Sequence, residues 1–149
     1  MHIYNKARQC LICFQEIESQ PSLYHFCHQS SLCLDCLNKF DIYNQQHYFH
    51  NYPLTILYYY NSFFKKILFQ YKGQDDYALK DAFLNPFYDF KTRYRRHLIA
   101  IVPSSDEDNK RRGFNPNEMI VQSFGNNIFT GLYKTSSYKQ ASQRWSSII

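Results

Sequence analysis

Four of the five cysteines form two closely spaced pairs near the N-terminus. Cys10 and Cys13 enclose two residues, Cys33 and Cys36 enclose two more, and nineteen residues separate the pairs. This C-x2-C-x19-C-x2-C spacing is typical of a four-cysteine zinc site, because each tight turn presents two sulfurs to one tetrahedral ion. Four thiolates leave no open coordination position, so we expect a structural Zn²⁺ rather than a catalytic one.

Other uses of these side chains stay open. A C-x-x-C pair can also be a redox pair, and cysteines are often buried as small apolar residues. His25, Cys27 and His28 lie between the two pairs. Any one of the three could replace a cysteine ligand, because cysteine-rich zinc sites also admit one histidine. Otherwise Cys27 is a spare thiol.

A second set of residues has the chemistry of an anion site. Arginine side chains match the geometry of phosphate oxygens, and glycine lets the backbone approach a ligand closely. A solvated basic turn is the simpler interpretation when composition alone is considered. The candidate anion or substrate-loop residues are Lys72, Arg111, Arg112, Gly113, Phe114 and Asn115. No residue is assigned a catalytic role.

The elements around these residues alternate between strand and helix. Leu54–Tyr60 is a β-favouring apolar run, and apolar residues recur at helical spacing from Asn61 to a stop at Gly73. Residues 75–84 predict a second helix, and residues 118–124 a third. The continuous apolar run at 98–102 suits a strand buried on both faces of a parallel sheet. This alternation favours an α/β fold.

Composition divides the 149 residues into two expected domains. Residues 1–40 hold all five cysteines and are too few to form a core without a metal. We predict a zinc-finger module over 1–40 and an α/β domain over 41–149. Hydrophobic residues make up 44% of the chain, which excludes a disordered regulator for most of the chain.

The charge and hydropathy patterns bear on partners and location. The net charge of +5 permits an anionic partner without requiring one. No secretory leader is visible, and Lys65 and Lys66 interrupt the most apolar stretch, so we expect no membrane span and a cytoplasmic location. The run Tyr58–Tyr60 could stack on nucleic-acid bases, although packing is the commoner use of such residues.

The order of these motifs resembles the ComF family of competence proteins. The cysteine module is followed by Y-K-G at 71–73, by V-P at 102–103 and by R-G-F-N at 112–115, and a weaker K-Q-A match lies at 139–141. The resemblance spans about residues 8–142. It implies an N-terminal zinc finger fused to a type I phosphoribosyltransferase-like domain. It also implies cytosolic partners, namely the DNA-import helicase and DNA-processing proteins, with single-stranded DNA as a further candidate.

The sequence departs from the family at two points. Pro116 stands where the family motif has glutamine. Type I phosphoribosyltransferases also carry two acidic residues followed by a Thr-Thr-Gly loop whose backbone N–H groups hold the 5′-phosphate. This chain contains no such combination. The nearest imitation, Asp106 to Asp108, is followed by Asn109 and Lys110. We therefore expect a C-terminally truncated chain with an incomplete parallel sheet and no catalysis.

Three functions remain in competition. The first is a ComF-like protein that assists uptake or processing of transforming DNA. The second is an active phosphoribosyltransferase of unknown acceptor, which the missing Thr-Thr-Gly loop disfavours. The third is a zinc-finger nucleic-acid or protein interaction module unrelated to that fold, which the R-G-F-N motif at 112–115 disfavours.

Overall fold

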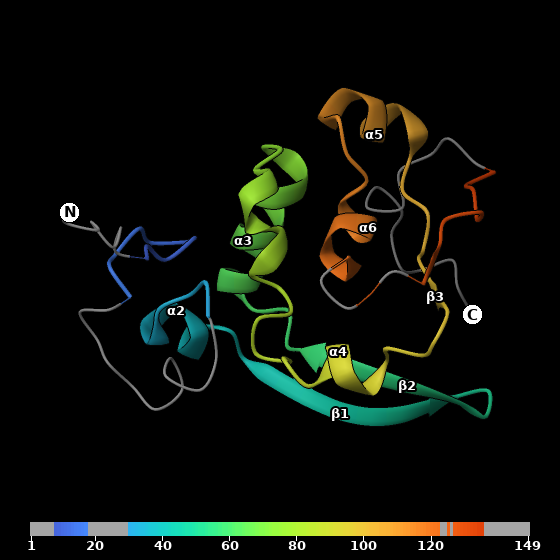
Figure 1. Cartoon of the computed structure of the whole chain (residues 1–149), viewed down its shortest axis with the longest axis horizontal. Helices are drawn as coiled ribbons and strands as arrows, with labels where there is room; N and C mark the ends of the chain where they lie inside the picture. The colour runs from blue at the N-terminus through green and yellow to red at the C-terminus, as the bar shows by residue number, and fades with distance from the viewer. Residues whose placement is uncertain (1–7, 18–29, 123–124, 126, 136–149) are drawn as a thin grey trace, which may run out of the picture.

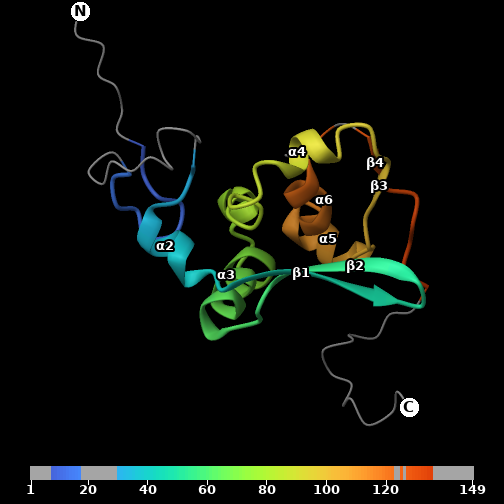
Figure 2. The ribbon, with the colours of Figure 1, turned by 90° about the horizontal axis from the view of Figure 1, so that it is seen from below.

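The computed structural model describes residues 8–17, 30–122, 125 and 127–135. Within them the chain combines short helices with two small sheets (Figure 1). The elements in chain order are α2 (Leu34–Lys39), β1 (Ile42–Phe49), β2 (Tyr52–Tyr58), α3 (Ser62–Gly73), the 3-10 helix η1 (Tyr77–Asp81), α4 (Phe90–Arg93), β3 (Ile99–Ala100), α5 (Asp106–Arg112), α6 (Pro116–Val121) and β4 (Ile128–Phe129). The cysteine-bearing segments and α2 lie at one end, and α5 and α6 lie at the other (Figure 1, Figure 2).

The strands β1 and β2 form an antiparallel hairpin. Phe49 pairs with Tyr52, and His50 and Asn51 between them form a two-residue turn. Both turn residues have positive φ, 47° and 67°, which matches the turn type that closes right-twisted hairpins. The strand predicted at Leu54–Tyr60 therefore exists with bounds shifted by two residues. It pairs within a hairpin and not, as expected, within a parallel sheet.

Two hydrogen bonds close the base of the hairpin, which we call its neck (residues 39–41 and 59–61). The backbone N–H of Tyr59 donates to the carbonyl of Asp41 over 2.9 Å. The side-chain amide of Asn61 donates to the carbonyl of Lys39 over 3.2 Å. The same Asn61 caps α3, since its Oδ1 accepts from the N–H of Phe64 at 2.8 Å. The helix predicted from Asn61 to Gly73 is confirmed.

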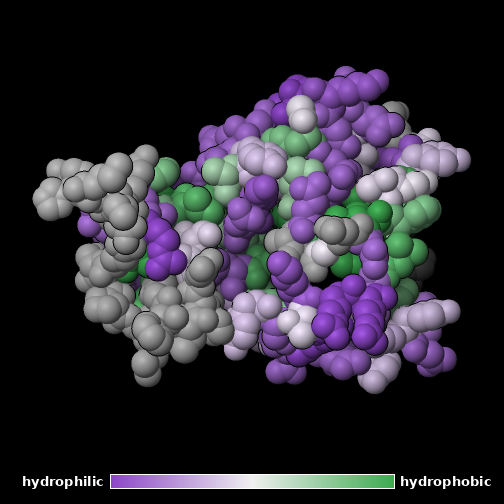
Figure 3. Space-filling model, viewed as in Figure 1, coloured by the Kyte–Doolittle hydropathy of each residue, from purple (hydrophilic) through white to green (hydrophobic). Residues whose placement is uncertain are grey.

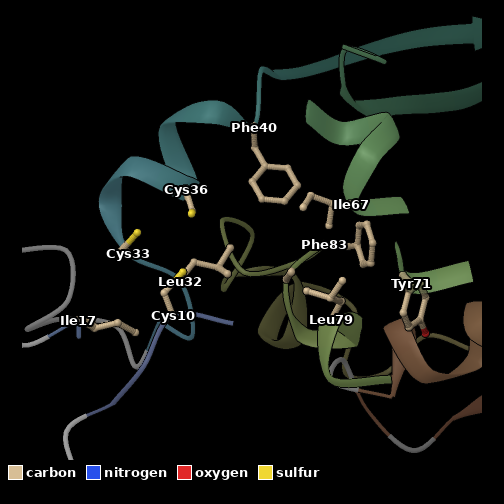
Figure 4. Packing of buried hydrophobic residues seen from close by; sticks show 11 residues of the cluster. Cys10, Ile17, Leu32, Cys33, Cys36, Phe40, Ile67, Tyr71, Leu79 and Phe83 are labelled. Carbon is tan, nitrogen blue, oxygen red and sulfur yellow. The ribbon is translucent and has the colours of Figure 1, made fainter. Parts of the chain in front are cut away.

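One hydrophobic core joins the cysteine-bearing segments to α3 and η1. Phe40 lies next to Phe63 at 5.2 Å between ring centroids, in an edge-to-face arrangement. Figure 4 shows side chains from both parts of the chain pointing toward one another. The packing therefore continues across residue 40, where composition places a domain boundary. The buried cluster comprises Cys10, Ile17, Leu32, Cys33, Cys36, Phe40, Ile67, Tyr71, Leu79, Ala82 and Phe83.

Two predicted elements differ from the structure. Residues 75–84 form a 3-10 helix over Tyr77–Asp81 and not a full α-helix, after Asp75 adopts a positive φ of 60°. The predicted buried strand at 98–102 pairs at only two residues, Ile99 and Ala100, in parallel with β4. Leu98 and Val102 are 71% and 76% exposed, so the expectation that this strand is buried on both faces is wrong for the described residues.

The segment predicted as a basic loop is largely helical. Ser105 caps α5, acidic residues fill its first turn, and Gly113 ends it with φ 78°. This charge order suits the helix dipole. None of its residues is buried, and Figure 3 shows hydrophilic residues over this part of the surface. No helix in the described part of the chain is long and apolar enough to cross a membrane.

Candidate metal centre

The first cysteine pair lies on a tight backbone turn. The N–H of Phe14 donates to the carbonyl of Cys10, and the N–H of Cys10 donates to the carbonyl of Gln15, both over 2.9 Å. Phe14 takes a positive φ of 60°, which lets the chain reverse directly after Cys13. Two residues within such a turn bring two sulfurs to one side.

The second pair lies at the start of α2. Cys33 occupies the N-cap position, and Cys36 lies one turn further along and is buried. The N–H of Leu11 donates to the carbonyl of Ser31 over 3.0 Å, so the two cysteine segments are hydrogen-bonded to each other. The turn and the helix start thereby face one another.

The four thiols converge on one point. The sulfur atoms of Cys10, Cys13, Cys33 and Cys36 all lie within 4.8 Å of one another. Those of Cys13 and Cys33 are 3.5 Å apart. Sulfurs at 2.3 Å from a tetrahedral zinc ion are about 3.8 Å apart. The structure therefore brings these four cysteines close enough to hold a metal ion, as the spacing predicts. Figure 4 shows three of them, Cys10, Cys33 and Cys36.

Burial and hydrogen bonding act differently on these thiols. Burial raises the pKa of Cys36, and the neighbouring cysteines raise it further. Burial also raises the pKa of Cys33. Burial of Cys10 acts in the same direction, but hydrogen bonds from the backbone of Cys13, Cys33 and Ile12 prevail and lower its pKa to about 7. The thiol of Cys10 is therefore more acidic than those of Cys33 and Cys36.

The donor set suits a closed metal site. Cys10, Cys33 and Cys36 are buried, and Cys13 is exposed at the surface. Four sulfur donors in a compact arrangement fit a tetrahedral ion that prefers thiolates. His25, Cys27 and His28, the predicted substitutes, lie outside the described residues.

The candidate anion residues gather where α3 ends and α5 packs against it. The side chain of Arg112 is 11% exposed, and its Nε donates to the carbonyl of Lys72 over 2.8 Å. The Nζ of Lys72 donates to Oδ1 of Asn117 over 2.9 Å. Burial lowers the pKa of Lys72, and the charge of Arg112 lowers it further. The two cations therefore lie side by side, 40 residues apart in sequence.

Acidic residues offset much of this positive charge. Arg111 pairs with Asp75 over 2.7 Å, and Arg112 lies 3.6 Å from the same carboxylate. Asp108 lies at 4.0 and 3.9 Å from the two arginines. Asp108 was weighed from the sequence only as part of an acidic stretch resembling the phosphoribosyltransferase motif, and Asp75 was not predicted as a site residue. The signal for Asp75 was present, since two acidic residues follow Gly73 after one intervening position.

The remaining three candidate anion residues make structural contacts in the same region. Gly113 ends α5 in the left-handed conformation, which a side chain would strain. The ring of Phe114 lies 5.7 Å from that of Tyr71. Asn115 caps α6, and its Oδ1 accepts from the N–H of Asn117 at 3.2 Å. The structure brings all six candidates into one region and gives each a structural contact. Their contact with an anion stays a prediction.

Comparison with known proteins provides no relative. No protein-family model matches the chain, and neither curated proteins nor solved structures match it.

Proposed function

We propose that this chain is a ComF-like protein that assists uptake or processing of transforming DNA. The observation that carries the proposal is the contact between two motif segments that are distant in sequence. The Y-K-G segment ends α3, the R-G-F-N segment links α5 to α6, and Arg112 bonds the carbonyl of Lys72. Tyr71 adds a second link, since its hydroxyl donates to the carbonyl of Pro116 over 2.7 Å. Two parts of one family signature are expected to meet in this way.

We assign Zn²⁺ to the four cysteines within this proposal. Cys10, Cys13, Cys33 and Cys36 would hold it as thiolates in a closed tetrahedral shell. Bound there, the ion supplies a cross-link between the first turn and α2, and no reactive position. Because Cys10, Cys33 and Cys36 belong to the shared core, the ion would also support the packing of α3.

The proposed role does not use phosphoribosyl transfer by this chain. The sequence has no acidic pair followed by the Thr-Thr-Gly loop that holds the sugar phosphate in type I phosphoribosyltransferases. The cations that could replace it, Arg111 and Arg112, already face Asp75. A protein that docks on a DNA-import helicase or on DNA-processing proteins fits these features better than an enzyme does.

Transformation frequency tests the proposal directly. Deletion of the gene in a naturally transformable strain that carries it should lower the number of transformants from purified DNA. A plasmid copy should restore them, and a copy with Cys36→Ser should not. A Cys27→Ser copy is the matched control, because Cys27 belongs to neither C-x-x-C pair in the sequence. Unchanged transformant numbers after deletion would refute the role.

A pair of titrations separates the alternatives. Binding of single-stranded DNA that weakens steeply with salt would favour a nucleic-acid module that contacts phosphates through Lys and Arg. Saturable binding of phosphoribosyl diphosphate would instead favour the enzyme. Under our proposal the phosphoribosyl compound binds weakly or not at all, and loss of Arg111 and Arg112 changes that result little.

A further inference from the structure

The outer edge of β1 has no partner strand in the described part of the chain. Among the residues that the structure describes, the hairpin is a sheet of two strands, so each strand has one edge without a partner strand there. Figure 1 shows β1 along the lower margin of the molecule, with no other described element beyond it. Unpaired edges expose backbone donors and acceptors that another strand can bond.

The two edges of the hairpin differ in their capacity to accept a strand. The pair that flanks a two-residue turn, Phe49 and Tyr52, exchanges hydrogen bonds, and successive pairs alternate. The N–H groups of Gln46 and Tyr48 therefore point away from β2. The corresponding position on β2 is Pro53, which pairs with Tyr48 and has no N–H. Proline thus protects the β2 edge, whereas β1 contains no proline and no charged residue.

The chemistry of this surface selects the partner. Residues 42–64 contain no Asp, Glu, Lys or Arg, although the whole chain carries a net charge of +5. A nucleic acid would need cations along its path, and the hairpin offers none. Two copies of an uncharged hairpin can approach without repulsion. Lysine residues, which commonly prevent such pairing at edges, are missing from β1.

We propose that β1 pairs antiparallel with β1 of a second copy of this chain. A two-fold axis makes this contact self-complementary and joins the hairpins into one four-stranded sheet. Tyr48 and Phe49 are 73% and 64% exposed. At about 200 Å² for each aromatic side chain, two copies offer about 550 Å² of aromatic surface.

The area sets the expected affinity. With the paired backbone and the glutamine side chains added, the contact buries at most about 1,000 Å², which is in the range of weak, transient interfaces. We therefore expect a dimer that dissociates on dilution, with a Kd on the order of 10 μM.

Sedimentation equilibrium of the full chain over a range of concentrations tests the proposal. The wild type should shift from 18.0 kDa toward twice that mass as concentration rises. Gln46→Pro removes an outward N–H without removing a bond to β2, so it should raise the Kd about tenfold or more. Thr55→Pro is the matched control. Thr55 pairs with Gln46, but its N–H points to the opposite edge, so this variant should dimerise like the wild type.

A second pair of variants tests the proposal without introducing proline, in case a proline variant does not fold. Gln46→Lys places a charge on the strand that would pair with the second copy and should also weaken the dimer, whereas Thr55→Lys places the same charge on the neighbouring strand, further from the contact. Circular dichroism must show that each variant retains the wild-type fold. A wild type whose mass stays at 18.0 kDa would overturn the proposal if the protein concentration is on the order of hundreds of micromolar, well above the expected Kd. Equal dimerisation of folded Gln46→Pro and Thr55→Pro would overturn it as well. Binding of oligothymidylate to a wild type that stays monomeric would assign the hairpin to nucleic acid instead.

Discussion

Replacing Tyr71 with phenylalanine removes a single oxygen atom from the contact between the two motif segments. The hydroxyl of Tyr71 is buried and donates to the carbonyl of Pro116 over 2.7 Å. The ring itself packs against Phe83, with 5.2 Å between centroids, and phenylalanine keeps that contact. The variant therefore isolates the hydrogen bond from the packing.

The expected cost follows from the orphaned carbonyl. Leaving a buried acceptor without its donor costs about 1–3 kcal/mol. For a domain of this size, that corresponds to a melting temperature lower by roughly 3–9 °C. Urea and thermal denaturation measure the change. Tyr60→Phe is the control, because Tyr60 is 67% exposed and its substitution should change stability by less than about 0.5 kcal/mol.

The pH dependence gives an independent check. Burial raises the pKa of Tyr71, with the charges of nearby acidic groups in the same direction. Below pH 10 the phenol is neutral in both states, so the stabilisation is fully present. Above pH 10 the unfolded tyrosine ionises first, so the advantage of the wild type over Tyr71→Phe should shrink. A loss no larger than that of Tyr60→Phe, or a difference that grows above pH 10, would refute the reasoning.

Three further outcomes are expected. Purified protein should contain about one zinc per chain by elemental analysis. The Cys36→Ser variant should lose both the metal and cooperative unfolding, whereas the control variant Cys27→Ser should keep both. Asp75→Asn should lower the free energy of unfolding by about 1 kcal/mol in low salt and by less in high salt, because its partner Arg111 is half exposed. Asn61→Ala should cost about 1 kcal/mol in chemical denaturation through loss of the α3 cap, and an unchanged midpoint would contradict that role.

Local signals in the sequence were sufficient to predict the structure of those short segments whose conformation depends mainly on their own residues. The cysteine spacing predicted the four-thiol cluster because each pair needs only one tight turn. The helix from Asn61 to Gly73 was predicted because an apolar stripe at helical spacing and a glycine at its end agree. In both cases the neighbours along the chain carry the information.

Long-range pairing could not be predicted in the same way. The apolar run at 98–102 matches a buried strand, but its burial depends on partners that periodicity does not reveal. The segment at 106–112 forms a helix because its acidic start and basic end suit the helix dipole, and this order of charges was not used in the prediction. The contacts of Arg111 and Arg112 with Asp75 join residues more than 35 positions apart, and no local pattern encodes them.

The hydrogen bonds at the neck of the hairpin make β1 and β2, here called the arm, a unit that is structurally independent of the rest of the molecule. Tyr59 bonds Asp41, and Asn61 bonds Lys39, so the chain enters and leaves the arm at one place. Tyr58 packs against Phe64 and marks where the body of the molecule begins. Residues between about 44 and 56 could therefore be shortened, extended or exchanged for another sequence while the neck and α3 stay in place. Related chains are expected to vary in arm length at this position more freely than anywhere else in the described body.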